Sequence, residues 1–239
     1  MNTIKVDRKN TKIVAHRGVS GLERENTNAA FVAAGNRSYW GVETDVHRTA
    51  DGHFAIMHDA NAKRVGGDNI NIEDSRWETV RSLHLSEIDG SHSRGDLRPP
   101  ELAEYISICK KYEKHCVLEL KSDFTEAEIA AIVEIIRGIG WLENVTFIAF
   151  GYENLEKVKA ILPEQKCQYL VNACDDALIE KLKAAGIDLD ISYPGVSEEL
   201  VRKLHEAGLE INVWTVDNAE LAARLIDWGV DYITSNILE

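Results

Sequence analysis

Short runs of valine, isoleucine and leucine alternate with amphipathic helical patterns along most of this chain of 239 residues. Apolar runs of about four to eight residues are typical of buried parallel strands, whereas repeats near every third and fourth residue are typical of helices. We predict strands at 13–16, 42–47, 116–120, 145–149, 167–171, 187–191, 210–215 and 231–234. We predict helices near 26–36, 101–113, 125–138, 153–162, 175–185, 197–207 and 218–228.

Residues at the ends of these segments support the helices. Thr125, Asp175 and Ser197 each precede a helical pattern and can accept hydrogen bonds from its first free amides, and acidic residues follow them in the first turn. Glycines stand where four helices should end, as expected for a left-handed residue after the last turn. These glycines are Gly138, Gly186, Gly208 and Gly229.

Eight strands separated by helices predict a (β/α)8 TIM barrel, with an open doubly wound sheet as the alternative. Residues 51–100 interrupt the alternation with turn signals, a short strand from His53 to His58 and several glycines. We interpret this segment as a small insertion after the second strand, above the face on which barrel active sites form. No shift in composition indicates a second domain, so we expect one domain over 1–239.

Composition and charge limit the binding partners, the localisation and the metal sites that we expect. Hydrophobic residues make up 44% and charged residues 28%, an ordinary globular balance, but the net charge of −13 argues against nucleic acid as a partner. No signal peptide or membrane-length apolar run is visible, so we expect a cytoplasmic protein without stable membrane association. Four cysteines form no C-x-x-C pair, which argues against a zinc site. The oligomeric state cannot be read from the sequence.

Carboxylates on two predicted strands are the first sign of chemistry. Glu43 and Asp45 alternate with apolar residues and therefore share one face of their strand. An exposed strand face would show the same alternation, but strands of a parallel barrel are covered on both sides, where paired carboxylates need a cation. Glu119 and Lys121 repeat the pattern, either as a strand-end ion pair or as a third ligand and a phosphate-binding cation. Oxygen ligands of this kind suit Mg²⁺ or Ca²⁺.

Two histidines and an arginine stand at predicted strand ends beside these acids. His16 and His58 could each transfer a proton at one end of a reacting phosphate ester, and Arg17 suits a phosphate. A single histidine in such a place is more often structural, but two beside an arginine and paired acids favour catalysis. Trp214 ends the seventh strand; it either packs in the core or forms an apolar wall against a small substrate. No P-loop, G-x-G-x-x-G or G-x-S-x-G motif supports nucleotide-dependent or serine chemistry.

Taken together, these motifs resemble the glycerophosphodiester phosphodiesterase family across nearly the whole chain. The ordered motifs that carry the resemblance are His16-Arg17-Gly18, Glu25-Asn26-Thr27 with Ala30-Phe31, Glu43-Thr-Asp45-Val46 with Thr49-Ala-Asp51-Gly52, His58-Asp59, Pro100-Glu-Leu102-Ala-Glu104, Glu119-Leu-Lys121 and Val213-Trp214-Thr215-Val216. Each motif is weak alone, but their order and spacing are specific.

The resemblance implies a TIM barrel and the metal-dependent hydrolysis of glycerophosphodiesters to sn-glycerol 3-phosphate and an alcohol, a reaction of lipid and glycerol metabolism. Matched position by position, it implies the following roles: His16 and His58 as the acid–base pair, Glu43, Asp45 and Glu119 as metal ligands, and Arg17 and Lys121 as phosphate-binding cations. The family reaction begins with attack of the neighbouring glycerol hydroxyl on phosphorus and passes through a cyclic phosphate. On this scheme His16 is the first base and His58 the first acid.

The chain departs from the family pattern at two places. Arg24 replaces the usual proline before Glu-Asn-Thr, which should change the loop after the first strand and the charge near the substrate. The usual Thr-Asp-x-Pro near the C-terminus is replaced by 234–237, Thr-Ser-Asn-Ile, so the end of the eighth strand is an uncertain substrate contact. Two alternatives stay open: a related phosphodiesterase, phospholipase D-like, for another lipid or sugar phosphodiester, and a non-catalytic phosphate-binding barrel.

Overall fold

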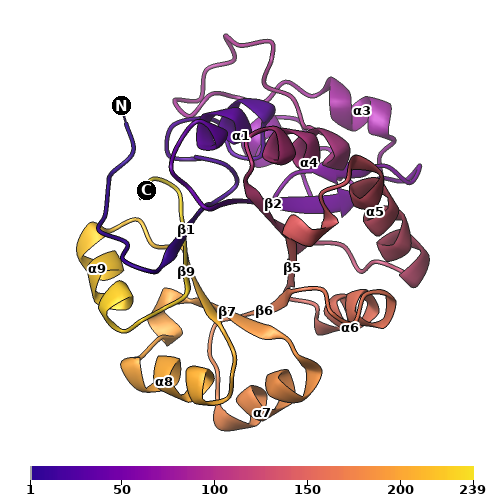
Figure 1. The fold of residues 1–239 in the computed structure, drawn as a ribbon. Helices are drawn as coiled ribbons and strands as arrows, with labels where there is room; N and C mark the ends of the chain where they lie inside the picture. The colour runs from indigo at the N-terminus through magenta and orange to yellow at the C-terminus, as the bar shows by residue number, and fades with distance from the viewer. Residues whose placement is uncertain (1) are drawn as a thin grey trace.

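A computed structural model describes residues 2–239 and shows a closed barrel of eight parallel strands surrounded by helices (Figure 1). The barrel strands are β1 (Lys12–Ala15), β2 (Gly41–Arg48), β4 (His115–Leu120), β5 (Val145–Ala149), β6 (Cys167–Val171), β7 (Asp188–Ser192), β8 (Ile211–Trp214) and β9 (Tyr232–Ser235). Neighbours in the barrel follow the chain order, and β1 pairs with both β2 and β9. This closure confirms the TIM barrel and excludes the open doubly wound sheet.

Seven longer helices cover the outside of the barrel, as the periodicity predicts. They are α1 (Asn28–Gly35), α4 (Leu102–Lys111), α5 (Glu126–Ile139), α6 (Tyr152–Ile161), α7 (Asp176–Ala185), α8 (Glu198–Glu206) and α9 (Ala219–Asp227). Short 3₁₀ turns, η1 (Leu142–Asn144) and η2 (Tyr193–Gly195), lie in two of the connections. Every predicted strand and helix of the barrel is present, with ends displaced by at most two residues.

The predicted helix caps are mostly confirmed. Thr125, Asp175 and Ser197 each accept a hydrogen bond from the amide three residues on. One prediction is wrong: Gly138 lies within α5, which ends at Ile139 and is capped by Gly140, whose φ of 73° is left-handed. The apolar stripe that packs α5 on the barrel continues past Gly138, so packing extends the helix by two residues.

The segment after β2 forms the predicted insertion. It contains β3 (Phe54–Ile56), which pairs antiparallel with β2, and the short helices α2 (Lys63–Gly66) and α3 (Trp77–Ser82). Most of its buried apolar side chains form a cluster separate from the main core, whereas Phe54 and Ile56 of β3 pack into the main core. The predicted short strand is therefore present but ends two residues before His58. In Figure 1 the insertion lies outside the barrel wall near β2, α1 and α4.

The barrel interior is polar near its centre. Asn212 donates to Asp190 Oδ2 at 3.2 Å and accepts from Thr234 at 3.1 Å, so these strands share a hydrogen-bonded layer. Cys116 and Cys167 are buried thiols, as expected. Across residues 2–239, no helix is both long enough and apolar enough to cross a bilayer.

Candidate active site

Three carboxylates meet inside the barrel near the ends of β2 and β4. The alternation of β2 turns Glu43 and Asp45 to the same face, and the register pairs Asp45 with Glu119 of β4. Their side chains are almost fully buried, at 3%, 0% and 8% exposed for Glu43, Asp45 and Glu119. One carboxylate oxygen from each lies within 4.8 Å of the others. The predicted ligand set is therefore brought together in space.

The three buried acids differ in pKa. Burial, followed by the neighbouring charge of Asp45, raises the pKa of Glu43 well above its usual range and that of Glu119 to about 8. Burial opposes ionisation of Asp45 too, but His58, Arg17 and Lys121 outweigh it and lower the pKa of Asp45. A cluster of this kind favours ionisation of all three acids only when a cation lies between them.

Cationic side chains lie on two sides of the carboxylates. The Arg17 amide donates to Glu43 Oε2 at 2.8 Å, and its guanidinium Nε lies 3.7 Å from Asp45 Oδ2. Lys121 Nζ lies 2.9 Å from Glu119 Oε1 and 3.7 Å from Asp45 Oδ1. Arg17 reaches the carboxylates from the loop after β1, where its left-handed φ of 54° turns the chain back toward them.

His16 follows β1 directly and lies above Glu43. Its Nε2 is 3.9 Å from Glu43 Oε2, beyond hydrogen-bonding distance, and its Nδ1 lies 2.7 Å from Asn236 Oδ1. Burial, and after it the charge of Arg17, lowers the pKa of His16 to about 4. His16 is therefore neutral at pH 7 and can accept a proton.

His58 enters from the insertion and has a different environment. Its Nδ1 lies 2.6 Å from Asp59 Oδ1, and Arg64 of α2 donates to Asp59 Oδ2 at 2.6 Å. Arg64 also donates to both oxygens of Glu25, which in turn accepts from Arg17 at 2.9 Å. Burial lowers the pKa of His58, while the Asp45 and Asp59 carboxylates oppose that change. The insertion thus supplies one histidine and the arginine that holds its carboxylate partner.

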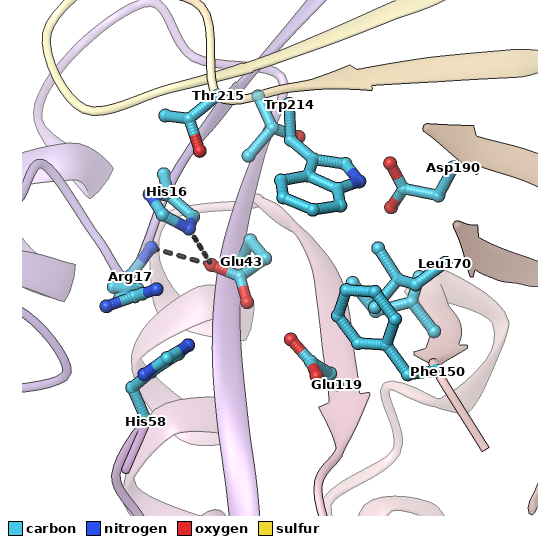
Figure 2. Close-up of a pocket in the computed structure, with 12 residues that line it drawn as sticks. His16, Arg17, Glu43, His58, Glu119, Phe150, Leu170, Asp190, Trp214 and Thr215 are labelled. Carbon is cyan, nitrogen blue, oxygen red and sulfur yellow. Dashed lines mark hydrogen bonds and ion pairs between the residues drawn. The ribbon is translucent and has the colours of Figure 1, made fainter. Parts of the chain in front are cut away.

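These groups line a cavity of about 90 Å³ at the C-terminal ends of the strands. Figure 2 shows the histidines and Arg17 on one side and the apolar side chains opposite them, with Glu43 and Glu119 between. The predicted residues that line it are His16, Arg17, Glu43, His58, Glu119 and Trp214. Asp45 and Lys121 do not line the cavity but contact the residues that do. The structure therefore joins all eight predicted positions into one site.

The opposite wall is mostly apolar, with Asp190 beside Trp214 (Figure 2). Trp214 packs edge-on against Phe150, with ring centroids 5.7 Å apart, and Ile148 and Leu170 complete this wall. Phe150 remains 45% exposed, so the wall extends to the protein surface. A cavity with acids and cations on one side and a ring wall on the other can hold a small phosphate ester by its charged end.

Comparison with known proteins agrees with this geometry. The glycerophosphoryl diester phosphodiesterase family matches residues 16–238. The chain belongs to this family. A phosphodiesterase from Oleispira antarctica, solved in complex with the product sn-glycerol-3-phosphate, superposes with a TM-score of 0.88 at 28% identity, covering 98% of this chain and 96% of that chain.

Curated relatives extend the match in sequence. A glycerophosphodiester phosphodiesterase of Caldanaerobacter subterraneus subsp. tengcongensis is 28% identical over 232 residues, covering 95% of this chain and 94% of that protein. A glycerophosphodiester phosphodiesterase of Bacillus subtilis is 26% identical, covering 93% of this chain and 82% of that protein. Its family membership makes the protein a phosphoric diester hydrolase.

Two departures from the family pattern have structural explanations. Arg24 does not line the cavity; its guanidinium donates to Ser86 Oγ at 3.0 Å and so binds the insertion. The guanidinium of Arg24 therefore points to the insertion and not into the cavity, and its effect on the substrate stays a prediction. At the end of β9, Ser235 and the next residue, Asn236, bind Asp217 instead of lining the cavity, and Asn236 contacts His16.

Sequence reasoning missed Asp190, which lines the cavity and is 1% exposed. Burial, and then the charge of Glu119, raises the pKa of Asp190 well above its usual range. The alternation of Asp188 and Asp190 on a predicted strand was the available signal, because Glu43 and Asp45 show the same spacing. Phe150 carries no signal of this kind, since it lies just beyond its strand.

Proposed function

We propose that this protein is a metal-dependent glycerophosphodiester phosphodiesterase that releases sn-glycerol 3-phosphate and an alcohol by two-histidine acid–base catalysis. The observation that carries the proposal is the convergence of three buried carboxylates with His16, His58 and two cations in and directly behind the lining of one cavity. The product complex of the Oleispira antarctica phosphodiesterase supports the choice of substrate class.

In the first half of the proposed reaction, His16 Nε2 takes the proton of the glycerol hydroxyl next to the phosphate. That oxygen attacks phosphorus and forms a cyclic glycerol phosphate. The bond from phosphorus to the alcohol oxygen breaks, and His58 donates its proton to that oxygen. The Asp45 carboxylate, and the Asp59 carboxylate beside Nδ1, favour the protonated form of His58 against the effect of burial, which lowers its pKa.

In the second half, a water molecule opens the cyclic phosphate and the histidines exchange roles. His58 takes a proton from the water, and His16 returns its proton to the hydroxyl oxygen that leaves phosphorus. Each histidine then has its starting protonation state, so the cycle balances. Arg17 lines the cavity and holds the phosphate oxygens, whereas Lys121 lies behind Glu119 and adds positive charge on that side.

The carboxylates fit a divalent cation. Among residues 2–239, Asp45 Oδ1 has no hydrogen-bond partner although it is buried, which is costly for an ionised oxygen. Glu43, Asp45 and Glu119 would hold the ion, and an all-oxygen donor set suits Mg²⁺ or Ca²⁺. When bound, the ion would neutralise charge on the phosphate and lower the pKa of the attacking hydroxyl.

A panel of glycerophosphodiesters with different alcohol groups tests the proposal. The assay separates sn-glycerol 3-phosphate from cyclic glycerol phosphate, with EDTA and then with added Mg²⁺ or Ca²⁺. We expect release of sn-glycerol 3-phosphate that stops in EDTA and returns with metal. Accumulation of the cyclic phosphate alone would indicate a transferase-type phosphodiesterase, and no turnover with metal bound would indicate a phosphate-binding barrel.

Matched acid-to-amide variants sharpen this test. Asp45→Asn removes a proposed ligand, and we expect turnover to fall by about 100-fold or more, since even groups that only support a metal ligand are worth about 10- to 100-fold. Asp188→Asn is the control, because Asp188 begins β7 and accepts from the Glu210 amide outside the cavity. Equal activity in the two variants would contradict the metal site.

A further inference from the structure

The loop after β9 contacts a proposed catalytic histidine, although its residues depart from the family pattern and do not line the cavity. Asn236 lies behind the His16 ring, on the side away from Glu43, with its Oδ1 2.7 Å from His16 Nδ1. The ring therefore has one nitrogen against this loop and the other toward the carboxylates.

The orientation of the Asn236 amide is determined by its other neighbours. Its nitrogen lies 2.6 Å from Asp217 Oδ2, and a carboxylate can only accept a hydrogen bond. The amide nitrogen must therefore point toward Asp217, which leaves the oxygen toward His16. The Ser20 hydroxyl donates to the same oxygen at 2.6 Å, which agrees with this orientation.

Asp217 is itself held in place. Its Oδ1 accepts from the backbone N–H of Asn236 at 2.8 Å and from the Ser235 hydroxyl at 2.9 Å. Asp217 therefore binds both the backbone and the side chain of the residue that it orients. The side-chain oxygen of Asn236 can only accept a hydrogen bond. The hydrogen between this oxygen and His16 must therefore lie on His16 Nδ1.

We propose that Asn236, oriented by Asp217, is a positioning residue that holds His16 as the Nδ1–H tautomer and leaves Nε2 unprotonated toward the cavity. This inference rests on the proposed function, because it assigns His16 as the base of the first step. His58, which faces a carboxylate instead of an amide oxygen, is then the acid. The neutral ring would otherwise distribute its proton between both nitrogens.

The tautomer can be measured directly. Protein labelled with ¹⁵N-histidine is examined by NMR at pH 7.5, with and without Mg²⁺, and the His16 signals are assigned by their loss in His16→Gln. We expect a protonated Nδ1 and an unprotonated Nε2 in the wild type, and a mixture of both forms in Asn236→Ala. A wild-type His16 with its proton on Nε2 would overturn the inference.

Kinetics give the second measurement. Asn236→Ala should lower kcat by about 10- to 100-fold, the usual effect of losing a group that orients a ligand or base, with KM changed by less than about threefold. KM should stay nearly unchanged because Asn236 does not line the cavity. Unchanged kcat together with an unchanged tautomer would refute the positioning role.

Two further variants separate positioning from folding. The double variant Asn236→Asp with Asp217→Asn exchanges the two groups: the carboxylate then accepts from His16 Nδ1 and from the new amide. We expect it to recover the Nδ1–H form, and to recover kcat toward the high-pH end of the pH–rate profile, because the new carboxylate also favours the protonated ring. Asn218→Ala is the control, because Asn218 caps α9 beside Asp217 without touching His16; it should keep both the tautomer and kcat.

The proposed function and this inference can fail separately. If no diester is hydrolysed with any metal, the proposed function fails, and the wild-type and Asn236→Ala spectra still decide the tautomer. If diesters are hydrolysed but the double variant shows neither the Nδ1–H form nor recovery of kcat, the positioning role fails alone.

Discussion

Replacing Glu119 with glutamine should stabilise the metal-free protein while it removes metal binding. Glu119 is 8% exposed, and burial together with Asp45 raises its pKa to about 8 from an ordinary 4.5. Between these values the folded protein keeps a proton that the unfolded chain has lost. Stability of the metal-free protein therefore falls as pH rises from 4.5 toward 8.

The magnitude follows from the size of this interval. At pH 7 Glu119 lowers the free energy of unfolding by about 3 kcal/mol, because each pH unit above 4.5 costs about 1.4 kcal/mol. Lys121 keeps Asp45 as a partner at 3.7 Å in the variant, so no cation is left unpaired. Allowing about 1 kcal/mol for the weaker hydrogen bond of the amide, we expect a gain of about 2 kcal/mol, or a Tm rise of about 4–8 °C.

Thermal unfolding in EDTA between pH 5 and pH 8 measures this gain. The difference in Tm between Glu119→Gln and the wild type should be small at pH 5 and grow toward pH 8. Addition of Mg²⁺ or Ca²⁺ at about 100 times its Kd should stabilise the wild type by about 2.7 kcal/mol and the variant much less. A variant that is less stable than the wild type in EDTA at pH 7, or equally stabilised by metal, would refute the reasoning.

Three further substitutions test separate features. His16→Ala should keep metal-induced stabilisation in the thermal assay but lose about 10²- to 10⁴-fold in turnover, because it removes only the proton acceptor; retained turnover would exclude His16 as the base. Gly18→Ala should destabilise by about 2 kcal/mol or more in urea unfolding, since φ is +77° and the added carbon would lie 2.6 Å from Ala30 Cβ. Arg64→Ala should lower kcat with little change in Tm, because Arg64 is half exposed and orients Asp59 beside His58; a fall in Tm without loss of kcat would mean that it serves the fold alone.

The pattern of the chain was sufficient to predict the barrel and the side chains that meet at the candidate site. Alternation on β2 placed Glu43 and Asp45 on one face, and β4 repeated the spacing at Glu119. Such predictions succeed because side-chain direction along a strand depends on neighbouring residues of the same segment. The resemblance to a family then supplied roles that the pattern left open.

Features that join distant segments were decided by the tertiary structure. The register of β2 against β4 places Asp45 beside Glu119, and closure of β1 on β9 brings Asn236 to His16. Loop residues such as Asn236 follow no periodicity, so their partners depend on how the barrel closes.

What the sequence by itself determined is the order of the elements, the faces of the strands and the types of group available for chemistry. Only the tertiary structure decided which of these groups meet, how deeply they are buried and hence which carboxyl keeps its proton. The physical reason is that local conformation follows from adjacent residues, whereas burial and charge proximity follow from contacts across the whole barrel. Asp190 shows both parts: its spacing was visible in the sequence, but its place in the cavity was not.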